Sequence, residues 1–171
     1  MTTSAGTAHR ALALVPRDAE GPAGTIWFCG HCGERPAIAG PPAANARVCE
    51  SCGMGLLLEA QAATAPAVGG AFVVLDRSLS ICAVSSGAEK LLETTETAAV
   101  NRHVTELLVP AEPEAPGGSH LATAVTRAVR GEQPGNVFVR PANLFGVRMR
   151  VRIVHCGPPQ AAMLVFDHPG T

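Results

Sequence analysis

Apolar and polar residues follow a regular pattern over the last hundred residues of the chain. Short apolar or alternating runs predict five strands, at 72–75, 81–84, 136–140, 146–154 and 161–167. Helix signals predict helices at 87–93, 102–108 and 119–130. The order is two strands, three helices and three strands. It predicts an α+β fold, in which a five-stranded antiparallel sheet has its helices inserted between strands two and three.

Local signals place the ends of two of these helices. The segment Ser86-Gly87-Ala88-Glu89 has the S-x-x-E form of a capping box, in which serine and glutamate side chains bond free amides at a helix start. Ser119 is a good N-cap for the longest helix, and Gly131 is a good stop.

Residues 146–154 alternate strictly between apolar and basic side chains. Because neighbours on a strand point to opposite faces, the apolar set must face the helices and the arginines must share the outer face. We expect Arg148, Arg150 and Arg152 to lie there together with Arg140 of the preceding strand. This face is either a solvated surface or a docking surface for an acidic partner or a second copy of the chain.

The first sixty residues contain four cysteines in the pattern C-x2-C-x16-C-x2-C, namely Cys29, Cys32, Cys49 and Cys52. A two-residue spacing lets both thiolates of a pair point at one ion, and two pairs supply the four sulfur ligands of a structural zinc site. A glycine follows each pair, as a tight metal-binding turn requires. Together with short flanking strands, the pattern over residues 25–60 resembles a zinc ribbon.

Other interpretations of the cysteines are less consistent with the sequence. A redox dithiol needs one pair beside a βαβ pattern, and two disulfides need an oxidising compartment. His31 lies inside the first pair, but four thiolates complete the shell, so we expect it to be an exposed turn residue. The remaining cysteines, Cys82 and Cys156, lie in strand-like runs and are expected to be buried.

Composition and charge limit the remaining possibilities. The 171 residues divide into a flexible tail (1–24), the zinc ribbon (25–60), an uncharged linker (61–70) and a second domain (71–168). With a net charge of −1, no global field attracts nucleic acid or an acidic membrane. No run approaches the roughly 20 apolar residues of a membrane span, and no signal peptide is recognisable. We therefore expect a cytoplasmic protein without membrane contact.

Residues 70–168 resemble the PAS domains in element order, length and local sequence. The similar stretches are a strand ending in Asp76, the segment SGAEKLL at 86–92 and the segment VNRHVTELL at 100–108. Asn101 stands where many PAS domains have glycine, and asparagine tolerates positive φ. The resemblance implies a sensory or regulatory module that binds a small molecule or another protein between its helices and its sheet.

The resemblance does not identify a ligand. Flavin-binding photosensor PAS domains carry a reactive cysteine in the helix that matches 102–108, and this stretch has none. Some haem-binding PAS domains use a histidine in the long helix, which makes His120 a candidate haem ligand; the alternative is an ordinary exposed residue near a helix start. His103 and His155 are weaker candidates.

Three functions follow as hypotheses. The leading one is a non-catalytic regulator in signal transduction or transcription regulation. It has no recognisable kinase, cyclase or helix-turn-helix segment, so its output would pass through contacts with a partner protein or a second copy. The alternative is a nucleic-acid-binding zinc-ribbon transcription regulator, although residues 25–60 carry two arginines against three glutamates. An enzyme is the third, but no carboxylate pair, Ser-His-Asp set or phosphate-binding loop is recognisable.

Overall fold

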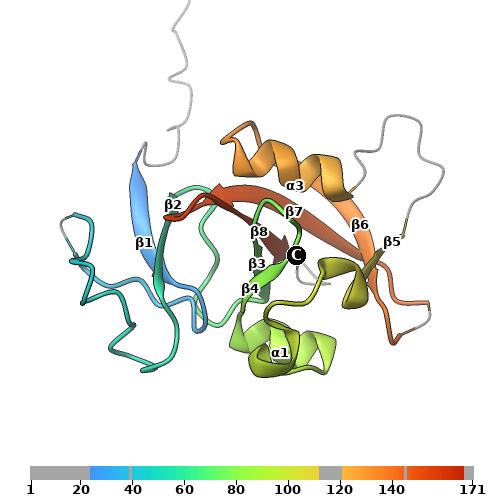
Figure 1. Ribbon diagram of the computed structural model, residues 1–171, viewed down its shortest axis with the longest axis horizontal. Coiled ribbons are helices and arrows are strands. Elements are labelled where there is room, and N and C mark those ends of the chain that lie inside the picture. The colour runs from blue at the N-terminus through green and yellow to red at the C-terminus, as the bar shows by residue number, and fades with distance from the viewer. Residues whose placement is uncertain (1–23, 39, 112–120, 145, 168–171) are drawn as a thin grey trace, which may run out of the picture.

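The computed structural model describes residues 24–38, 40–111, 121–144 and 146–167. Within these residues the main sheet has six antiparallel strands in the order β4-β3-β8-β7-β6-β5. Their bounds are Phe72–Leu75 (β3), Ile81–Val84 (β4), Leu108–Pro110 (β5), Gly135–Pro141 (β6), Met149–Cys156 (β7) and Ala161–Phe166 (β8). A separate pair, β1 (Thr25–Cys29) and β2 (Leu57–Gln61), forms a two-stranded antiparallel sheet beside it (Figure 1). The fold is therefore α+β, as predicted.

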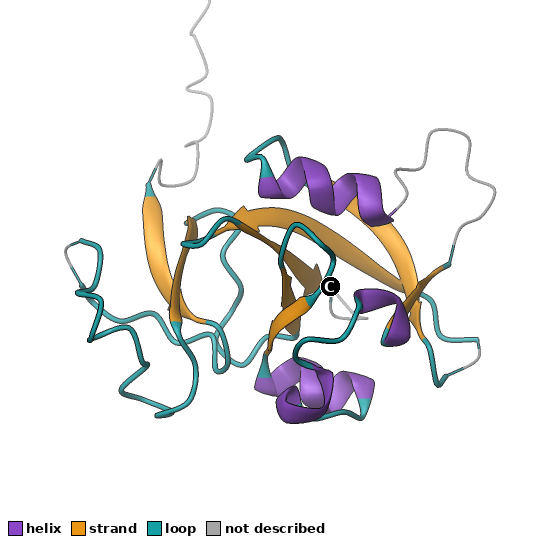
Figure 2. Ribbon diagram, in the orientation of Figure 1, coloured by secondary structure: helices purple, strands orange, loops and turns teal. Residues whose placement is uncertain are grey.

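Helices cover the inner face of the main sheet (Figure 2). Their bounds are Ser86–Leu92 (α1), Glu96–Ala99 (α2), Val104–Glu106 (the 3-10 helix η1) and Leu121–Val129 (α3). The apolar stripe of α3 packs with inward-facing side chains of β6, β7 and β8, and α1 packs beside β3. Leu75, Leu92, Val125 and Ile153 are all within 1% of complete burial. These contacts form the main hydrophobic core, which lies between the helices and the sheet.

The outer face of the same sheet is partly covered by the β1–β2 pair (Figure 1). A second cluster of apolar side chains joins the two sheets: Phe28 and Ala60 from the pair, and Phe72, Val74, Val154, Cys156, Ala161 and Met163 from the main sheet. The rings of Phe28 and Phe72 meet edge to face with centroids 5.8 Å apart. The backbones of Glu59 and Gly157 exchange two hydrogen bonds. The small sheet and the large one thus share a core.

Residues 62–70 do not separate the two sheets as a free linker would. The N–H of Gly69 donates to the carbonyl of Cys32 at 2.9 Å, and the Arg35 guanidinium donates to the carbonyl of Pro66 at 2.8 Å. The sequence led us to expect two separate cores because the segment is uncharged and rich in small residues. That expectation is corrected, since hydrogen bonds tie the segment to the first cysteine turn and Ala65 packs against the cluster shared by the two sheets.

Two local expectations also differ from the structure. Ser85, not Ser86, is the N-cap of α1, and its Oγ accepts from the N–H of Ala88. Residues 104–110 form a 3-10 turn and the short edge strand β5, so the sheet gains a sixth strand where a helix was predicted. Asn101 has φ of 68°, which agrees with its place at a glycine-like position. The predicted N-cap Ser119 lies outside the described residues.

Within the described part of the chain, no helix is both long enough and apolar enough to cross a membrane.

Candidate metal centre

The two cysteine pairs sit on matching backbone turns. Cys29 ends β1, and its carbonyl accepts the N–H of Gly33 at 3.0 Å; the carbonyl of Cys49 accepts the N–H of Gly53 at 2.8 Å. Both glycines have positive φ, 75° and 68°, a conformation that side chains with a Cβ rarely adopt. The glycine after each pair therefore allows the chain to turn so that both sulfurs of that pair face the same point.

The four sulfurs form a compact set. All four Sγ atoms lie within 4.8 Å of one another, with Cys29 and Cys52 3.6 Å apart and Cys32 and Cys49 3.9 Å apart. Four sulfurs bound tetrahedrally to zinc at about 2.3 Å would lie about 3.8 Å apart. The donor set fits a closed four-thiolate zinc site, which leaves no position for water or substrate.

Backbone amides point at the sulfurs and tune their acidity. The N–H groups of His31 and Cys32 each donate to Cys29 Sγ at 3.4 Å. Burial nevertheless raises the pKa of the Cys29 thiol from 9.0 to about 12. At Cys52 burial acts in the same direction but is outweighed by the amides of Gly55 and Met54 and by the neighbouring thiols, which lower its pKa to about 6. A cation is needed to hold all four groups as thiolates together.

Gly55 is part of this centre, although no sequence motif identified it. Its N–H donates to Cys52 Sγ at 3.5 Å, and its carbonyl accepts the N–H of Cys49 at 2.8 Å. A Cβ at this position would collide with Cys29 Sγ and would lie 2.8 Å from the backbone nitrogen of His31. Only glycine lets the second turn approach the first so closely.

Apolar residues cover one side of the sulfurs. Trp27 and Leu57 pack with Cys29 and Cys49 in a small buried cluster, and the other two cysteines lie against it. The tryptophan is 9% exposed. The single tryptophan of the chain therefore lies against the cysteine centre.

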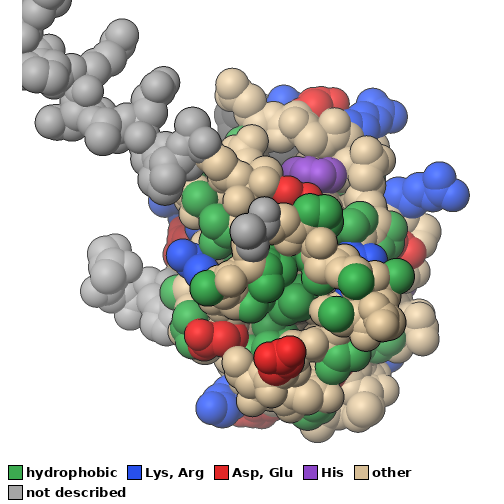
Figure 3. Space-filling model, turned by 90° about the vertical axis from the view of Figure 1, so that its left-hand side faces the viewer, with side chains coloured by type: hydrophobic (Ala, Val, Ile, Leu, Met, Phe, Trp, Pro, Cys, Tyr) green, Lys and Arg blue, Asp and Glu red, His purple; other side chains and the backbone are tan. Residues whose placement is uncertain are grey.

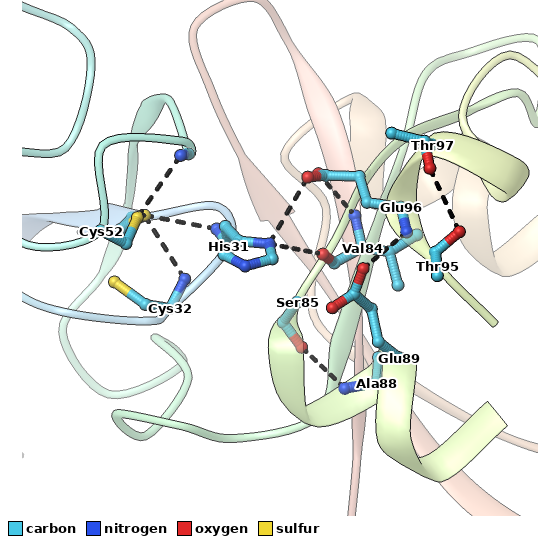
Figure 4. Close-up of polar contacts among 12 residues, drawn as sticks. His31, Cys32, Cys52, Val84, Ser85, Ala88, Glu89, Thr95, Glu96 and Thr97 are labelled. Atoms are coloured by element: carbon cyan, nitrogen blue, oxygen red, sulfur yellow. Dashed lines mark hydrogen bonds and ion pairs between the residues drawn. The ribbon is translucent and has the colours of Figure 1, made fainter. Parts of the chain in front are cut away.

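His31 connects the cysteine centre to the main sheet (Figure 4). Its Nδ1 lies 3.3 Å from the carbonyl of Val84 and 3.4 Å from Oε2 of Glu96, and its own carbonyl accepts the N–H of Ser86 at 2.9 Å. The residue is 8% exposed. The prediction of an exposed turn residue is wrong, because the end of β4 and the start of α1 pack over the first cysteine pair.

The contact continues into the helical part of the molecule. Oε1 of Glu96 accepts the N–H of Val84 at 3.1 Å, and the N–H of Glu96 donates to Glu89 Oε1 at 2.7 Å. Glu89 lies in α1 and Glu96 opens α2. A short polar chain thus runs from His31, beside the cysteines, through Glu96 to both helices.

Arg140, Arg150 and Arg152 lie on strands at the outer side of the main sheet, as predicted. The predicted strand 146–154 begins only at Met149, so Arg148 precedes it, and Val147 is 44% exposed and does not face the helices. Arg150 and Arg152 of β7 lie opposite Phe138 and Asn136 of β6, and Arg140 follows on β6, opposite Val109 of β5. The Arg148 guanidinium stacks 4.0 Å above the Phe138 ring, Arg150 pairs with Asp167 at 3.6 Å, and Arg152 donates to the carbonyl of Ala63 at 3.5 Å. This arginine face occupies the part of the outer surface beside the β1–β2 pair.

Other candidate residues are placed more simply. Cys156 is fully buried, as expected, but Cys82 is exposed, because its side chain points to the outer face at the edge strand β4. His103 caps η1, and Nδ1 of His155 lies 3.1 Å from the carbonyl of Ala128. The haem candidate His120 lies outside the described residues.

Comparison with known proteins gives similarity at the level of structure. No family model matches the sequence, and no curated protein matches it. Among solved structures, the chain is similar to the PAS domain of nitrogen regulation protein NR(II) from Vibrio parahaemolyticus, with 16% identity and a TM-score of 0.43 over 58% of this chain and 88% of that one. The chain is also similar to the PAS domain of an HTR-like protein from Haloarcula marismortui, with 15% identity and a TM-score of 0.41 over 57% of this chain and 84% of that one. A chain of the E. coli DhaR(N)-DhaL complex is similar with 15% identity and a TM-score of 0.40 over 60% of this chain and 33% of that one.

Proposed function

We propose that this protein is a non-catalytic sensory or regulatory module of the PAS type, built together with a structural zinc ribbon and acting through a partner protein. The cytoplasm is its proposed location, and signal transduction or transcription regulation its proposed context. Support comes from the α+β element order of residues 71–167, from the closed set of four sulfurs and from the resemblance to PAS domains in the segments at 86–92 and 100–108.

Zinc at Cys29, Cys32, Cys49 and Cys52 would cross-link the two turns and supply folding energy to the β1–β2 pair. The residues around it hold the sulfurs in place: Trp27 excludes water on one side, and the amides near Cys29 and Cys52 bond the thiolates. A closed shell of four sulfurs offers no open coordination position. The centre therefore supports a structural role for the ion.

The observation that carries the proposal is the contact between the zinc ribbon and the main sheet. His31 lies between the first cysteine pair and the Val84–Glu96 contact, and Phe28 lies in the cluster shared with β3. A displacement of either unit must change apolar packing and hydrogen bonds in the other. Such mechanical continuity is what a module without its own catalytic site needs in order to pass a shape change to a partner.

The arginine face is the proposed contact surface. It gathers four arginines on one side of a protein whose net charge is −1, and Arg148 and Arg150 are exposed there beside the ribbon. An acidic protein surface complements it, and complementary charge mainly raises the association rate. A second copy of the chain or a nucleic acid are the competing occupants.

A triple variant tests this surface. Arg148→Gln, Arg150→Gln and Arg152→Gln together remove three charges, while exposed arginines contribute little to stability, so we expect a fall of only a few degrees in the melting temperature. Partners captured from the native cell and identified by mass spectrometry should be lost with the variant. Sedimentation of the purified protein reports on self-association. The matched control changes three exposed arginines elsewhere, Arg77, Arg127 and Arg130, to glutamine.

The outcomes separate the hypotheses. Loss of a protein partner with the arginine-face variant and not with the control supports the proposal. Recovery of the same partners with both variants contradicts a role for this face. Capture of salt-sensitive nucleic acid by the wild type alone favours the nucleic-acid-binding alternative.

A further inference from the structure

A cavity of about 470 Å³ lies between the zinc ribbon and the outer face of the main sheet. Its floor is formed by Gly30 and Leu58 of the ribbon and by Val74 and Ala83 of the sheet. Figure 3 shows hydrophobic side chains gathered around a hollow on the side of the molecule where the ribbon lies. The volume is in the range of sites that hold small molecules.

The walls of the cavity are also apolar. On the ribbon side stand Met54 and Leu56, whose exposed fractions are 62% and 57%, and on the opposite side stand Pro158 and Pro159. Large apolar side chains that are exposed together around one hollow are typical of a binding site. Hydrogen bonds between the backbones of Glu59 and Gly157 join the two walls beside the prolines and hold them in place.

Two of the three charged side chains that line the cavity are acidic. Asp76, at the end of β3, and Glu96, at the start of α2, both line it. Oδ1 of Asp76 already accepts from the Ser78 amide and hydroxyl and from the Ser80 amide, which leaves Oδ2 to receive a further donor. Those hydrogen bonds outweigh the opposing effect of desolvation and lower the pKa of Asp76, so the carboxylate stays ionised at neutral pH.

The one basic side chain among the residues that line the cavity is engaged elsewhere. The Arg47 guanidinium donates to the carbonyl of Pro158 at 2.7 Å and to that of Leu57 at 3.5 Å. It therefore ties the ribbon to the turn between β7 and β8. Glu96 is engaged too, with the Val84 amide and with His31, so the Asp76 carboxylate is the charge left to meet a ligand, and it disfavours anions.

We infer that this cavity binds a small molecule with an apolar body and one protonated amine, the body lying on Val74 and Ala83 and the amine donating to Asp76. The inference goes beyond the proposed function, which requires no small molecule. It also differs in place from the ligand position that the PAS resemblance implies. That position lies between helices and sheet, where the main core is packed, whereas this cavity lies on the other side of the sheet.

A pair of probes that share one apolar ring system and differ in charge tests the inference. 1-Naphthylmethylamine is a cation at pH 7 and 1-naphthylacetate is an anion, and each is titrated into the zinc-loaded, ¹⁵N-labelled full chain. The amine should shift the amide signals of Gly30, Gly55 and Ala83 saturably and bind at least tenfold more tightly than the acetate. Asp76→Asn, which keeps the side-chain acceptor and removes the charge, should reduce that preference severalfold.

Variants of the cavity locate the site. Ala83→Leu fills the floor and should weaken amine binding at least tenfold, while Ala122→Leu on the exposed face of α3 should leave it unchanged. Leu56→Lys, on the exposed wall, adds a repelling cation and serves as an independent test if Ala83→Leu does not fold. Equal affinity for both probes, shifts confined to other surfaces, or undiminished amine binding by the folded cavity variants would overturn the inference.

Discussion

At the scale of single residues, the cysteine centre depends as much on a missing side chain as on the four thiols. Gly55 supplies an amide to one sulfur and leaves room for another, and no ligand-spacing pattern includes it. Asp76 has a local structural role elsewhere in the molecule, since its carboxylate accepts hydrogen bonds from the turn that joins β3 to β4. A conservative substitution at each position, Gly55→Ala or Asp76→Asn, tests its role.

Gly55→Ala should weaken the metal centre. The added Cβ would collide with Cys29 Sγ and press on the backbone of His31, and overpacking of this kind costs about 1–3 kcal/mol. We expect the melting temperature to fall by roughly 3–10 °C and the apparent zinc affinity to fall about tenfold or more. Gly40→Ala, where a Cβ would meet nothing within 4 Å, is the control. Equal zinc affinity and stability in both variants would contradict the close approach.

Asp76→Asn should change the acid dependence of stability. Although desolvation opposes it, hydrogen bonds from Ser78 and Ser80 hold the pKa of Asp76 below its ordinary value of 3.8. A group with a lowered folded-state pKa stabilises the fold above its unfolded pKa, and this contribution is lost as the pH falls through the folded value. The difference in unfolding free energy between wild type and variant should therefore shrink between about pH 5 and pH 3. A pH-independent difference would mean that the charge does not contribute.

At the scale of elements, the β1–β2 pair and the main sheet stabilise each other through their apolar faces. A two-stranded sheet alone is marginal in water, and here one of its faces is buried against β3, β7 and β8. The metal centre lies at one end of this pair, and the shared cluster lies along it. The pair is thus held at two places, once by its proposed zinc ion and once by packing.

Phe28→Ala should destabilise both sheets. The ring is completely buried and meets Phe72 at an interplanar angle of 76°, so its loss leaves a cavity and removes an aromatic contact. Such substitutions cost about 3–5 kcal/mol. Chemical denaturation of the zinc-loaded protein measures the change, and Val68→Ala, at a position 60% exposed, should shift the midpoint little. If the variant destabilised only β1 and β2 and left the unfolding midpoint of the main sheet unchanged, the main sheet would not depend on this contact.

At the scale of the whole molecule, the ribbon and residues 71–167 form one packed body. If residues 61–70 were the free linker that the sequence predicted, removing zinc would unfold residues 25–60 alone. The shared cluster and the His31 contacts with Val84 and Glu96 lead to a different expectation. Unfolding of the ribbon would expose the outer faces of Phe72, Val74 and Met163 to water.

Chelation of zinc should therefore loosen the main sheet as well as the ribbon. In hydrogen exchange we expect protection to fall in β1 and β2 and also in β3, β4, β7 and β8, and to return when zinc is added back. The strands β5 and β6, which lie farthest from the ribbon in the strand order, should change least and serve as an internal control. Unchanged protection throughout residues 71–167 would restore the view of two independent cores.

The sequence by itself determined the features that depend on short-range spacing. Two pairs of cysteines at two-residue spacing indicated the sulfur set, alternation within residues 146–154 placed Arg150 and Arg152 on one face, and apolar runs located the five longer strands of the main sheet. Each of these follows from the geometry of a turn or a strand, which a few neighbouring residues specify. The edge strand β5 was missed, because its three residues carry no periodic signal and gain their strand conformation only by pairing with β6.

Only the tertiary structure decided how these parts meet. It buried His31, exposed Cys82, selected Ser85 over Ser86 as the helix cap and joined the ribbon to the outer face of the sheet. Ser85 illustrates the reason: its hydroxyl also accepts the N–H of Phe72 and donates to the carbonyl of Gly70, both far away in the sequence. Burial and hydrogen-bond partners of this kind depend on segments brought together by the whole fold, whereas a spacing pattern describes only a residue and its neighbours.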